Sequence, residues 1–198
     1  KIRSPFSPSV LVSNYHPAVQ RIDYDQPKLF FHGKEDPLSM FYYSPLIYKN
    51  TWFNSGEQAY QYAKARFFGD QTRASRIMTS DSPVKAKHLG KEVRPFDKEL
   101  WSVAREKIVR DINYAKFSQD PVLLRILLAT RDYVLCETDP FDKTWGIGLS
   151  SKDRRAHDHQ RWLGDNLMGK ILTIVRFELQ QQQPEEEQVD KSMKDRTA

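Results

Sequence analysis

The stretch from residue 54 to residue 68, NSGEQAYQYAKARFF, constrains the fold more than any other part of the chain. It has the composition of a helix and carries a signal at each end. Ser55 is placed to cap the first turn, and Gln58, three residues later, is placed to reach back to it as in a capping box. Gly69 supplies the left-handed residue that ends many helices. These signals predict a helix with defined ends, around which the rest of the domain is organised.

One face of this predicted helix carries a carboxylate, an amide and an amine. Glu57 and Lys64 are two helical turns apart, about 10 Å along the axis, and Gln61 lies between them. Burial among aromatic neighbours would raise the pKa of Glu57 and lower that of Lys64. A neutral lysine can form an imine with a carbonyl-like carbon, and a protonated carboxyl group can assist a leaving group. The alternative is an ordinary surface helix, since charged helix residues are usually solvated.

The other segments predict further helices and a few short strands. Two short apolar runs flank a polar turn at Lys49-Asn50, as in a β-hairpin, and Gly90 is expected just past the end of a helix that Ser82-Pro83 opens. The predicted helices cover residues 54–68, 72–79, 83–89, 97–115, 120–128 and 166–179, and the predicted strands cover 29–33, 45–48, 51–53 and 133–137. The fold class is therefore α+β and predominantly α-helical, in a single domain.

Three regions follow from the composition along the chain. Residues 1–28 contain four prolines among polar residues and predict an extended N-terminal arm. Residues 29–180 form the predicted catalytic domain. Residues 181–198 are rich in glutamine and acidic residues and predict a disordered tail.

Charge and cysteine usage restrict the partners and the compartment. The formal net charge is +5 and the isoelectric point is about 9.2, which favours anionic ligands such as phosphates, nucleotides or nucleic acid. Cys136 is the single cysteine, so an internal disulfide is excluded and a reducing compartment is favoured. No apolar run approaches the length that crosses a membrane, and no secretory signal is visible. We expect an intracellular protein, cytoplasmic or nuclear, without a membrane partner.

Several cofactor and metal motifs are missing from the sequence. Gly90-Lys91 lacks the other residues of a nucleotide-binding P-loop, and neither a G-x-S-x-G elbow nor a paired CxxC occurs. His157 and His159 lie two residues apart without a third ligand, so a solvated loop is favoured over a metal site. The basic cluster from Lys152 to Arg161 suits phosphate contact and solvent exposure equally well. We expect no metal and no cofactor.

Two tryptophans and an asparagine are candidates for a structural role or for a ligand contact. Trp101 lies on the apolar stripe of its predicted helix, which indicates a core residue. Trp145 stands beside Gly146 and Gly148, where a ring and exposed backbone N–H groups can together hold a base or a phosphate. Asn166 is placed either to cap the last helix or to direct its amide at a ligand near the positive helix end.

The order of these segments resembles the NADAR family, also called YbiA-like. That family opens with a Pro-Leu-Ser-Asn-Phe segment followed by a helix of pattern Ser-x-Glu-x-x-x-Gln-x-x-Lys, which this chain matches from Pro37 to Tyr42 and from Ser55 to Lys64. The resemblance covers about residues 30 to 180. It continues through Ala86-Lys-His-Leu-Gly90, Trp101 with Arg105, Lys116-Phe117, Leu127-Leu-Ala-Thr130, Leu135-Cys-Glu137, Trp145-Gly-x-Gly148, Gly164-x-Asn-x-Met-Gly169 and Val175-Arg176.

The resemblance implies an N-glycosidase that cleaves bonds at ribose carbon one. Lys64 would be the nucleophile that forms an imine with the opened ribose, and Glu57 would be its acid/base partner. Family members act on ADP-ribose attached to guanine in nucleic acid or on phosphoribosyl intermediates of riboflavin synthesis. The residues that the resemblance implies for substrate binding are Ser39, Phe41, Gln61, Trp101, Trp145, Gly146, Gly148 and Asn166.

Two departures from the family pattern affect the choice of substrate. Met40 stands where the family has asparagine, so a substrate hydrogen bond is altered or the activity is lost. The loop from Ser150 to Arg161 is longer and more basic than in compact bacterial members, which favours ADP-ribosylated nucleic acid over the riboflavin intermediates. Two alternatives of another class stay open: a module that binds ADP-ribose or a nucleotide without cleaving it, and a nucleic-acid-binding domain that acts through its basic loop.

Overall fold

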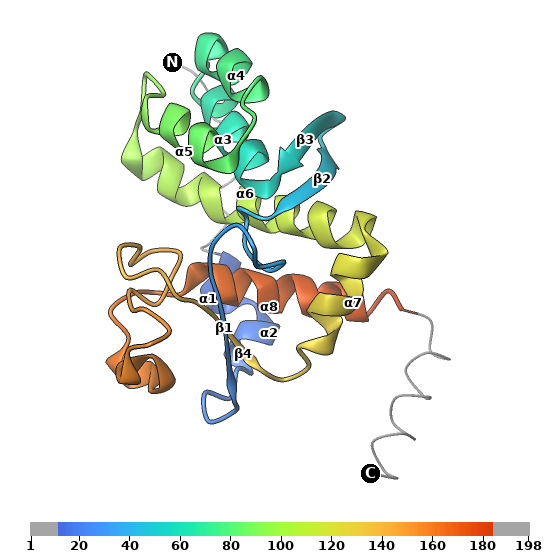
Figure 1. Ribbon diagram of the computed structural model, residues 1–198, viewed down its shortest axis with the longest axis vertical. Helices are drawn as coiled ribbons and strands as arrows, with labels where there is room; N and C mark the ends of the chain where they lie inside the picture. Colours follow the sequence, from blue (N-terminus) through green and yellow to red (C-terminus); the bar gives the residue numbers. More distant parts are fainter. Residues whose placement is uncertain (1–11, 184–198) are drawn as a thin grey trace.

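The computed structural model describes residues 12–183 and confirms an α+β domain in which helices dominate (Figure 1). The predicted tail therefore lies outside the described residues from residue 184 onward, as does the predicted arm up to residue 11. The helices are α1 (Val12–Tyr15), α2 (Pro17–Gln20), α3 (Gly56–Phe67), α4 (Gln71–Met78), α5 (Pro83–Lys91), α6 (Lys98–Gln119), α7 (Pro121–Ala129) and α8 (Leu167–Gln180), with two short 3-10 helices, η1 (Arg154–His157) and η2 (His159–Arg161). The strands are β1 (Lys28–Phe31), β2 (Tyr43–Tyr48), β3 (Thr51–Ser55) and β4 (Val134–Glu137).

The long helix α6 crosses the middle of the molecule and separates two groups of elements (Figure 1). On one side α3, α4 and α5 pack together with the β2–β3 hairpin, and on the other side α8 packs on α6 and β4. The main core surrounds α6, which packs against both α3 and α8. Its fully buried members include Phe53, Ile112, Phe117, Leu127, Ile171 and Val175.

The ends of α3 follow the predicted signals with one difference. Ser55 Oγ accepts a hydrogen bond from the Gln58 backbone N–H at 3.3 Å, as the capping prediction requires. The reciprocal half of the predicted capping box is wrong, because Gln58 Oε1 accepts from the backbone N–H of Asn54 at 2.8 Å instead. The Gln58 amide nitrogen donates to the backbone carbonyls of Ile77 and Ser80, so this side chain joins α3 to the end of α4.

Gly90 is a second correction, because it lies inside α5 rather than just past its end. A Cβ atom at this position would overlap Gln61 Oε1 on α3. The glycine is therefore required by the close approach of α5 to α3, and not by a left-handed helix end.

The strand β1 pairs in parallel with β4, which joins residues about a hundred positions apart in sequence. Phe31 is the register partner of Glu137 at the carboxyl ends of the two strands. Side chains that follow these strands therefore emerge together at one edge. The predicted hairpin is confirmed, with β2 antiparallel to β3 and Tyr48 opposite Thr51.

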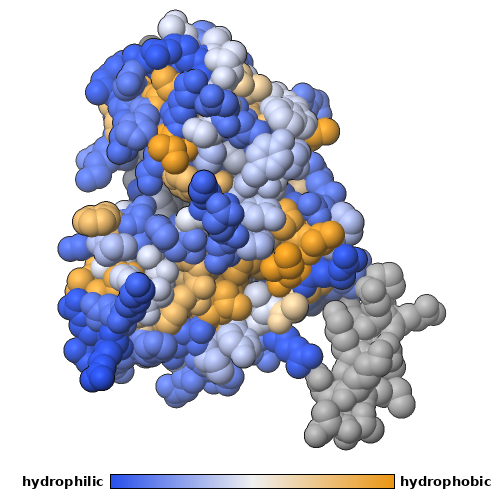
Figure 2. Space-filling view, viewed as in Figure 1, coloured by the Kyte–Doolittle hydropathy of each residue, from blue (hydrophilic) through white to orange (hydrophobic). Residues whose placement is uncertain are grey.

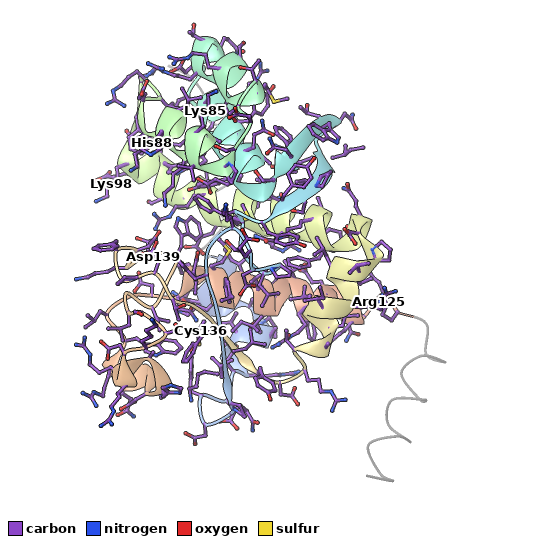
Figure 3. All side chains as sticks on the ribbon, viewed as in Figure 1. Lys85, His88, Lys98, Arg125, Cys136 and Asp139 are labelled. Atoms are coloured by element: carbon purple, nitrogen blue, oxygen red, sulfur yellow. The ribbon has the colours of Figure 1, made fainter. Side chains whose placement is uncertain are left out.

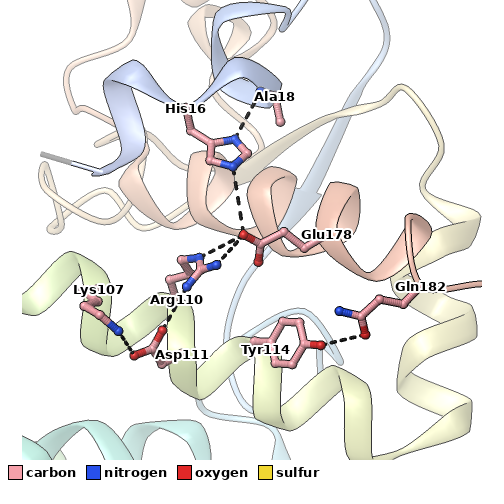
Figure 4. A network of polar contacts seen from close by, with 8 residues as sticks. All are labelled: His16, Ala18, Lys107, Arg110, Asp111, Tyr114, Glu178 and Gln182. Carbon is pink, nitrogen blue, oxygen red and sulfur yellow. Dashed lines mark hydrogen bonds and ion pairs between the residues drawn. The ribbon is translucent and has the colours of Figure 1, made fainter.

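The prolines predict an extended N-terminal arm, but the described part of the arm is not extended throughout. Residues 12–20 form the one-turn helices α1 and α2, both of which contact α8. Pro17 starts α2 in a position where its missing N–H costs nothing, and His16 Nδ1 caps that turn by accepting from Ala18 N. His16 Nε2 also lies 4.0 Å from Glu178, which pairs with Arg110 on α6 (Figure 4). The described part of the arm is thus attached to the domain by a polar network.

Candidate active site

A pocket of about 340 Å³ lies between α3 and α5 on one side and the segments that follow β1 and β4 on the other. The predicted site residues that line this pocket are Ser39, Phe41, Glu57, Gln61, Lys64 and Trp145. Glu57 and Lys64 therefore share one pocket, which helix spacing alone could not establish. The face of the molecule drawn in Figure 2 is mostly hydrophilic over α4 and α5, and hydrophobic side chains gather over α8 and toward α7.

Four predicted site residues lie outside the pocket lining: Trp101, Gly146, Gly148 and Asn166. Trp101 is 5% exposed and donates from Nε1 to the Tyr60 hydroxyl at 3.1 Å. It belongs to the core, as its helical stripe predicts, and supports the wall residue Tyr60 from behind. Tyr60 in turn meets Trp145 edge-on, with ring centroids 5.8 Å apart.

The two glycines permit tight backbone packing beneath the pocket. A Cβ atom on Gly146 would lie 2.8 Å from the carbonyl oxygen of Glu137. Gly148 has a φ of +69°, and its neighbour Ile147 donates its N–H to the same Glu137 carbonyl at 2.8 Å. Both glycines therefore shape the turn behind the pocket.

Asn166 neither caps α8 with its side chain nor faces the pocket. Its backbone is left-handed, with a φ of 51°, and its side chain is buried. Oδ1 accepts from the Glu137 N–H at 3.1 Å, and Nδ2 donates to the Leu135 carbonyl at 2.8 Å. The amide thus forms hydrogen bonds with backbone groups at the edge of β4 and fixes the backbone that carries Glu137.

Glu57 is 6% exposed and occupies the first turn of α3. Its Oε1 accepts a hydrogen bond from Gln61 Nε2 at 2.8 Å. Burial raises the pKa of Glu57 above its ordinary value, and the Gln61 hydrogen bond and the charges of Lys87 and Lys64 oppose that change. A carboxyl group with a raised pKa holds its proton more readily than a solvated one, which suits it to proton transfer.

Lys64 is half-buried near the end of α3. Its Nζ donates to the Gly90 carbonyl at 2.9 Å and lies 4.5 Å from the centroid of the Phe96 ring. Burial lowers the pKa of Lys64, the charge of Arg94 lowers it further, and the charge of Glu57 raises it. The lowered pKa makes the neutral, nucleophilic form of this amine more accessible than in a solvated lysine.

Glu137 is a pocket residue to which sequence reasoning assigned no role. It ends β4 and lines the pocket together with Asp139 and Asp142. Its Oε2 is inaccessible to solvent and has no hydrogen-bond partner among the described residues. Burial, followed by the charges of Asp142 and Asp139, raises the pKa of Glu137 to about 8. The available signal was a carboxylate at the carboxyl end of a predicted strand, just before the Trp145 loop.

The turn that carries Ser39 and Phe41 is held from beneath by a buried lysine. Lys116 Nζ donates to the carbonyls of Pro37 and Ser39, each at 2.7 Å. Burial lowers the pKa of Lys116 to about 7. Within this turn Met40 is buried and lines the pocket, and its sulfur packs so closely on Gly56 that a Cβ atom there would lie 2.6 Å away.

The basic loop and the two histidines lie away from the pocket lining. His159 stacks on Tyr24 with ring centroids 4.4 Å apart, and His157 meets Phe30 edge-on. Within residues 12–183, no three His, Cys, Asp or Glu side chains are grouped so that they could hold a metal ion. The same residues include no helix with the length and apolar character needed to span a bilayer.

Comparison with known proteins assigns the chain to a family. The NADAR domain matches residues 11–180, and the chain belongs to the NADAR family. It is 39% identical over 127 residues to an N-glycosidase of Acanthamoeba polyphaga mimivirus, an alignment that covers 64% of this chain and 75% of the viral protein. It is 30% identical over 162 residues to a riboflavin biosynthesis protein of Vibrio vulnificus, covering 81% of this chain and 40% of that protein.

A solved structure shows the same fold. The NMR structure of the Escherichia coli protein YbiA superposes with a TM-score of 0.64 at 25% identity, covering 78% of this chain and 85% of that one. In sequence, the E. coli N-glycosidase YbiA is 29% identical over 118 residues, which is 60% of this chain and 67% of YbiA. The relatives of this chain within the NADAR family thus include proteins named as N-glycosidases.

Proposed function

We propose that this protein is an N-glycosidase that hydrolyses a bond between a base nitrogen and carbon one of ribose, with Lys64 as the nucleophile. The observation that carries the proposal is a half-buried lysine of lowered pKa in one pocket with two carboxyl groups of raised pKa, Glu57 and Glu137. The names of the viral and bacterial relatives support the same reaction class.

The reaction can be written as three balanced steps. First the bond between carbon one and the ring oxygen breaks, the oxygen takes a proton from a buried carboxyl group, and the lone pair of the base nitrogen forms a C=N bond to carbon one. Neutral Lys64 then adds to carbon one and gives up a proton, and the base leaves with the C–N electron pair and that proton, so that a protonated lysine imine remains. Water adds to the imine carbon and expels the amine, which releases the sugar as an aldehyde that closes again to a ribose ring with its phosphate substituents intact.

The two carboxyl groups divide the proton transfers. Glu137, whose pKa of about 8 keeps it largely protonated at neutral pH, is suited to donate the proton to the ring oxygen. Glu57, held by Gln61, is suited to take the proton that Lys64 releases and later to activate water. Trp145 and Tyr60 supply aromatic walls for a sugar or base.

The preferred substrate is ADP-ribose attached to guanine in nucleic acid. The net charge of +5 and the pocket residues Lys87 and Lys91 suit a diphosphate. The second candidate is a phosphoribosyl intermediate of riboflavin synthesis, which the name of the Vibrio vulnificus relative favours. The proposal includes a cytoplasmic or nuclear setting, where such substrates occur.

The test is to incubate the purified protein with an oligonucleotide ADP-ribosylated on guanine and to follow free ADP-ribose by mass spectrometry. Lys64→Ala and Lys64→Arg serve as matched variants, the second of which keeps a positive charge but cannot form the imine. Release by the wild type alone supports the proposal. Absence of release moves the phosphoribosyl substrates to first place, and if those also persist, a non-catalytic binding module is the better account, with Met40 as the altered position.

A further inference from the structure

One aromatic side chain at the edge of the pocket is almost completely exposed. Phe141 is 96% exposed, and it lies between Asp139 and Asp142, both of which line the pocket. Trp145, four residues later, lines the same pocket. The turn therefore presents one aromatic ring to the pocket and a second one to solvent just outside it.

The turn is ordered by hydrogen bonds of its own, which fix the backbone that carries Phe141. Asp139 Oδ1 accepts from the Phe141 N–H at 2.8 Å. Asp142 Oδ1 accepts from the N–H groups of Thr144 at 2.9 Å and Trp145 at 2.8 Å. Because these carboxylates are engaged with the backbone, they hold the turn that presents Phe141.

The opposite side of the pocket is basic. Lys87 and Lys91 on α5 line the pocket, and Lys87 Nζ lies 5.2 Å from the centroid of the Phe41 ring. Figure 3 shows Lys85 and His88 on the same helix, in the part of the molecule that lies above Asp139 in that view. A ligand that leaves the pocket here meets positive charge from α5 and a flat apolar ring from the 139–142 turn.

Single-stranded nucleic acid matches this combination better than a protein partner does. Base stacking on an aromatic ring and phosphate contact with lysines are the two usual components of single-strand recognition. A protein interface would need a contiguous apolar patch, whereas Phe141 is flanked by Asp139, Asp142 and the exposed Lys143. An isolated ring in a charged setting fits a single base.

We propose that Phe141 stacks on a base adjacent to the modified nucleotide, so that the protein acts on ADP-ribosylated guanine within a single strand in preference to the free modified nucleoside. This inference rests on the proposed function and specifies its substrate. In a duplex the neighbouring base is already stacked, so the preference should be lost when the complementary strand is added.

The test compares kcat/KM on two substrates: a short single-stranded oligonucleotide with one ADP-ribosylated guanine, and ADP-ribosylated guanosine. Phe141→Ala should lower kcat/KM on the strand by roughly 5- to 150-fold, the range expected for one stacked base, and change the value on the nucleoside by less than about 2-fold. Phe141→Trp should retain the preference for the strand. Trp52→Ala, which removes a 54% exposed ring outside the pocket lining, is the control and should change neither value.

Equal losses on both substrates, or no loss on the strand, would overturn the stacking role. If the wild type releases ADP-ribose from neither substrate, the preferred substrate of the proposed function is wrong. Stacking is then decided in fluorescence anisotropy by binding of the same oligonucleotide carrying a fluorescent label. Weaker binding by Phe141→Ala than by Trp52→Ala supports stacking. Equal binding by these two variants overturns it.

Discussion

Ionisation of Glu137 should make the protein less stable as the pH rises, and Glu137→Gln should remove that effect. The pKa of this carboxyl group is about 8 in the native protein, against an ordinary value of 4.5. The native state therefore holds the proton more tightly than the unfolded chain. This contribution to stability is fully present below pH 4.5 and is lost as the pH rises through about 8.

The size of the effect follows from the difference in proton affinity. Each tenfold change in proton affinity corresponds to about 1.4 kcal/mol, so the full pKa difference corresponds to about 5 kcal/mol. Most of this difference is expressed between pH 5 and pH 8. Because Glu137 is only partly buried and lines the pocket, screening by solvent lowers the expected loss over this interval to about 2–3 kcal/mol. Glutamine has nearly the same shape and does not titrate.

The assay is urea unfolding of the wild type and Glu137→Gln at pH 5 and pH 8. The free energy of unfolding of the variant relative to wild type should rise by about 2–3 kcal/mol between the two values, whatever constant offset the substitution introduces. Glu35→Gln, at a carboxylate with a side chain that is 88% exposed, is the control and should shift by less than about 0.5 kcal/mol. Parallel profiles for wild type and Glu137→Gln would refute the claim that this carboxyl group is held neutral.

Two further substitutions test the geometry of the pocket. Glu57→Gln should bind substrate normally but turn over at least about 10-fold more slowly, because an amide cannot exchange the proton; unchanged single-turnover rates would remove Glu57 from the mechanism. Gly90→Ala should displace the Gln61 side chain and slow turnover to the level of Gln61→Ala. The free energy of unfolding of Gly90→Ala should change by less than about 1 kcal/mol, because the helix propensity of alanine, worth about 1 kcal/mol, offsets the cost of displacing Gln61. Wild-type turnover in Gly90→Ala would show that Gln61 does not position Glu57.

The parts of the fold that sequence predicted are those with local causes. The start of α3 at Ser55 and the β2–β3 hairpin depend on residues within a few positions of each other, and both are confirmed. Gly90 was placed wrongly because its role depends on Gln61, which comes from another helix. The pairing of β1 with β4 was not predicted either, since its partners are distant in sequence.

The same distinction holds for the candidate site. Glu57, Gln61 and Lys64 were predicted because one helix carries them at a regular spacing. The contacts of Asn166 were not predicted, because its amide bonds to the edge of β4, a partner that no local pattern reveals. Glu137 received no role, since an unpaired carboxylate oxygen becomes visible only when the surrounding elements are in place.

The imine at Lys64 is the central claim, and reductive trapping tests it most directly. Borohydride added during turnover of an ADP-ribosylated guanine oligonucleotide would reduce an imine to a stable secondary amine. We predict that mass spectrometry of the digested protein finds ADP-ribose on the peptide that contains Lys64, and that Lys64→Arg carries no such adduct. Turnover by the wild type without an adduct, or an adduct on another lysine such as Lys87, would contradict the account.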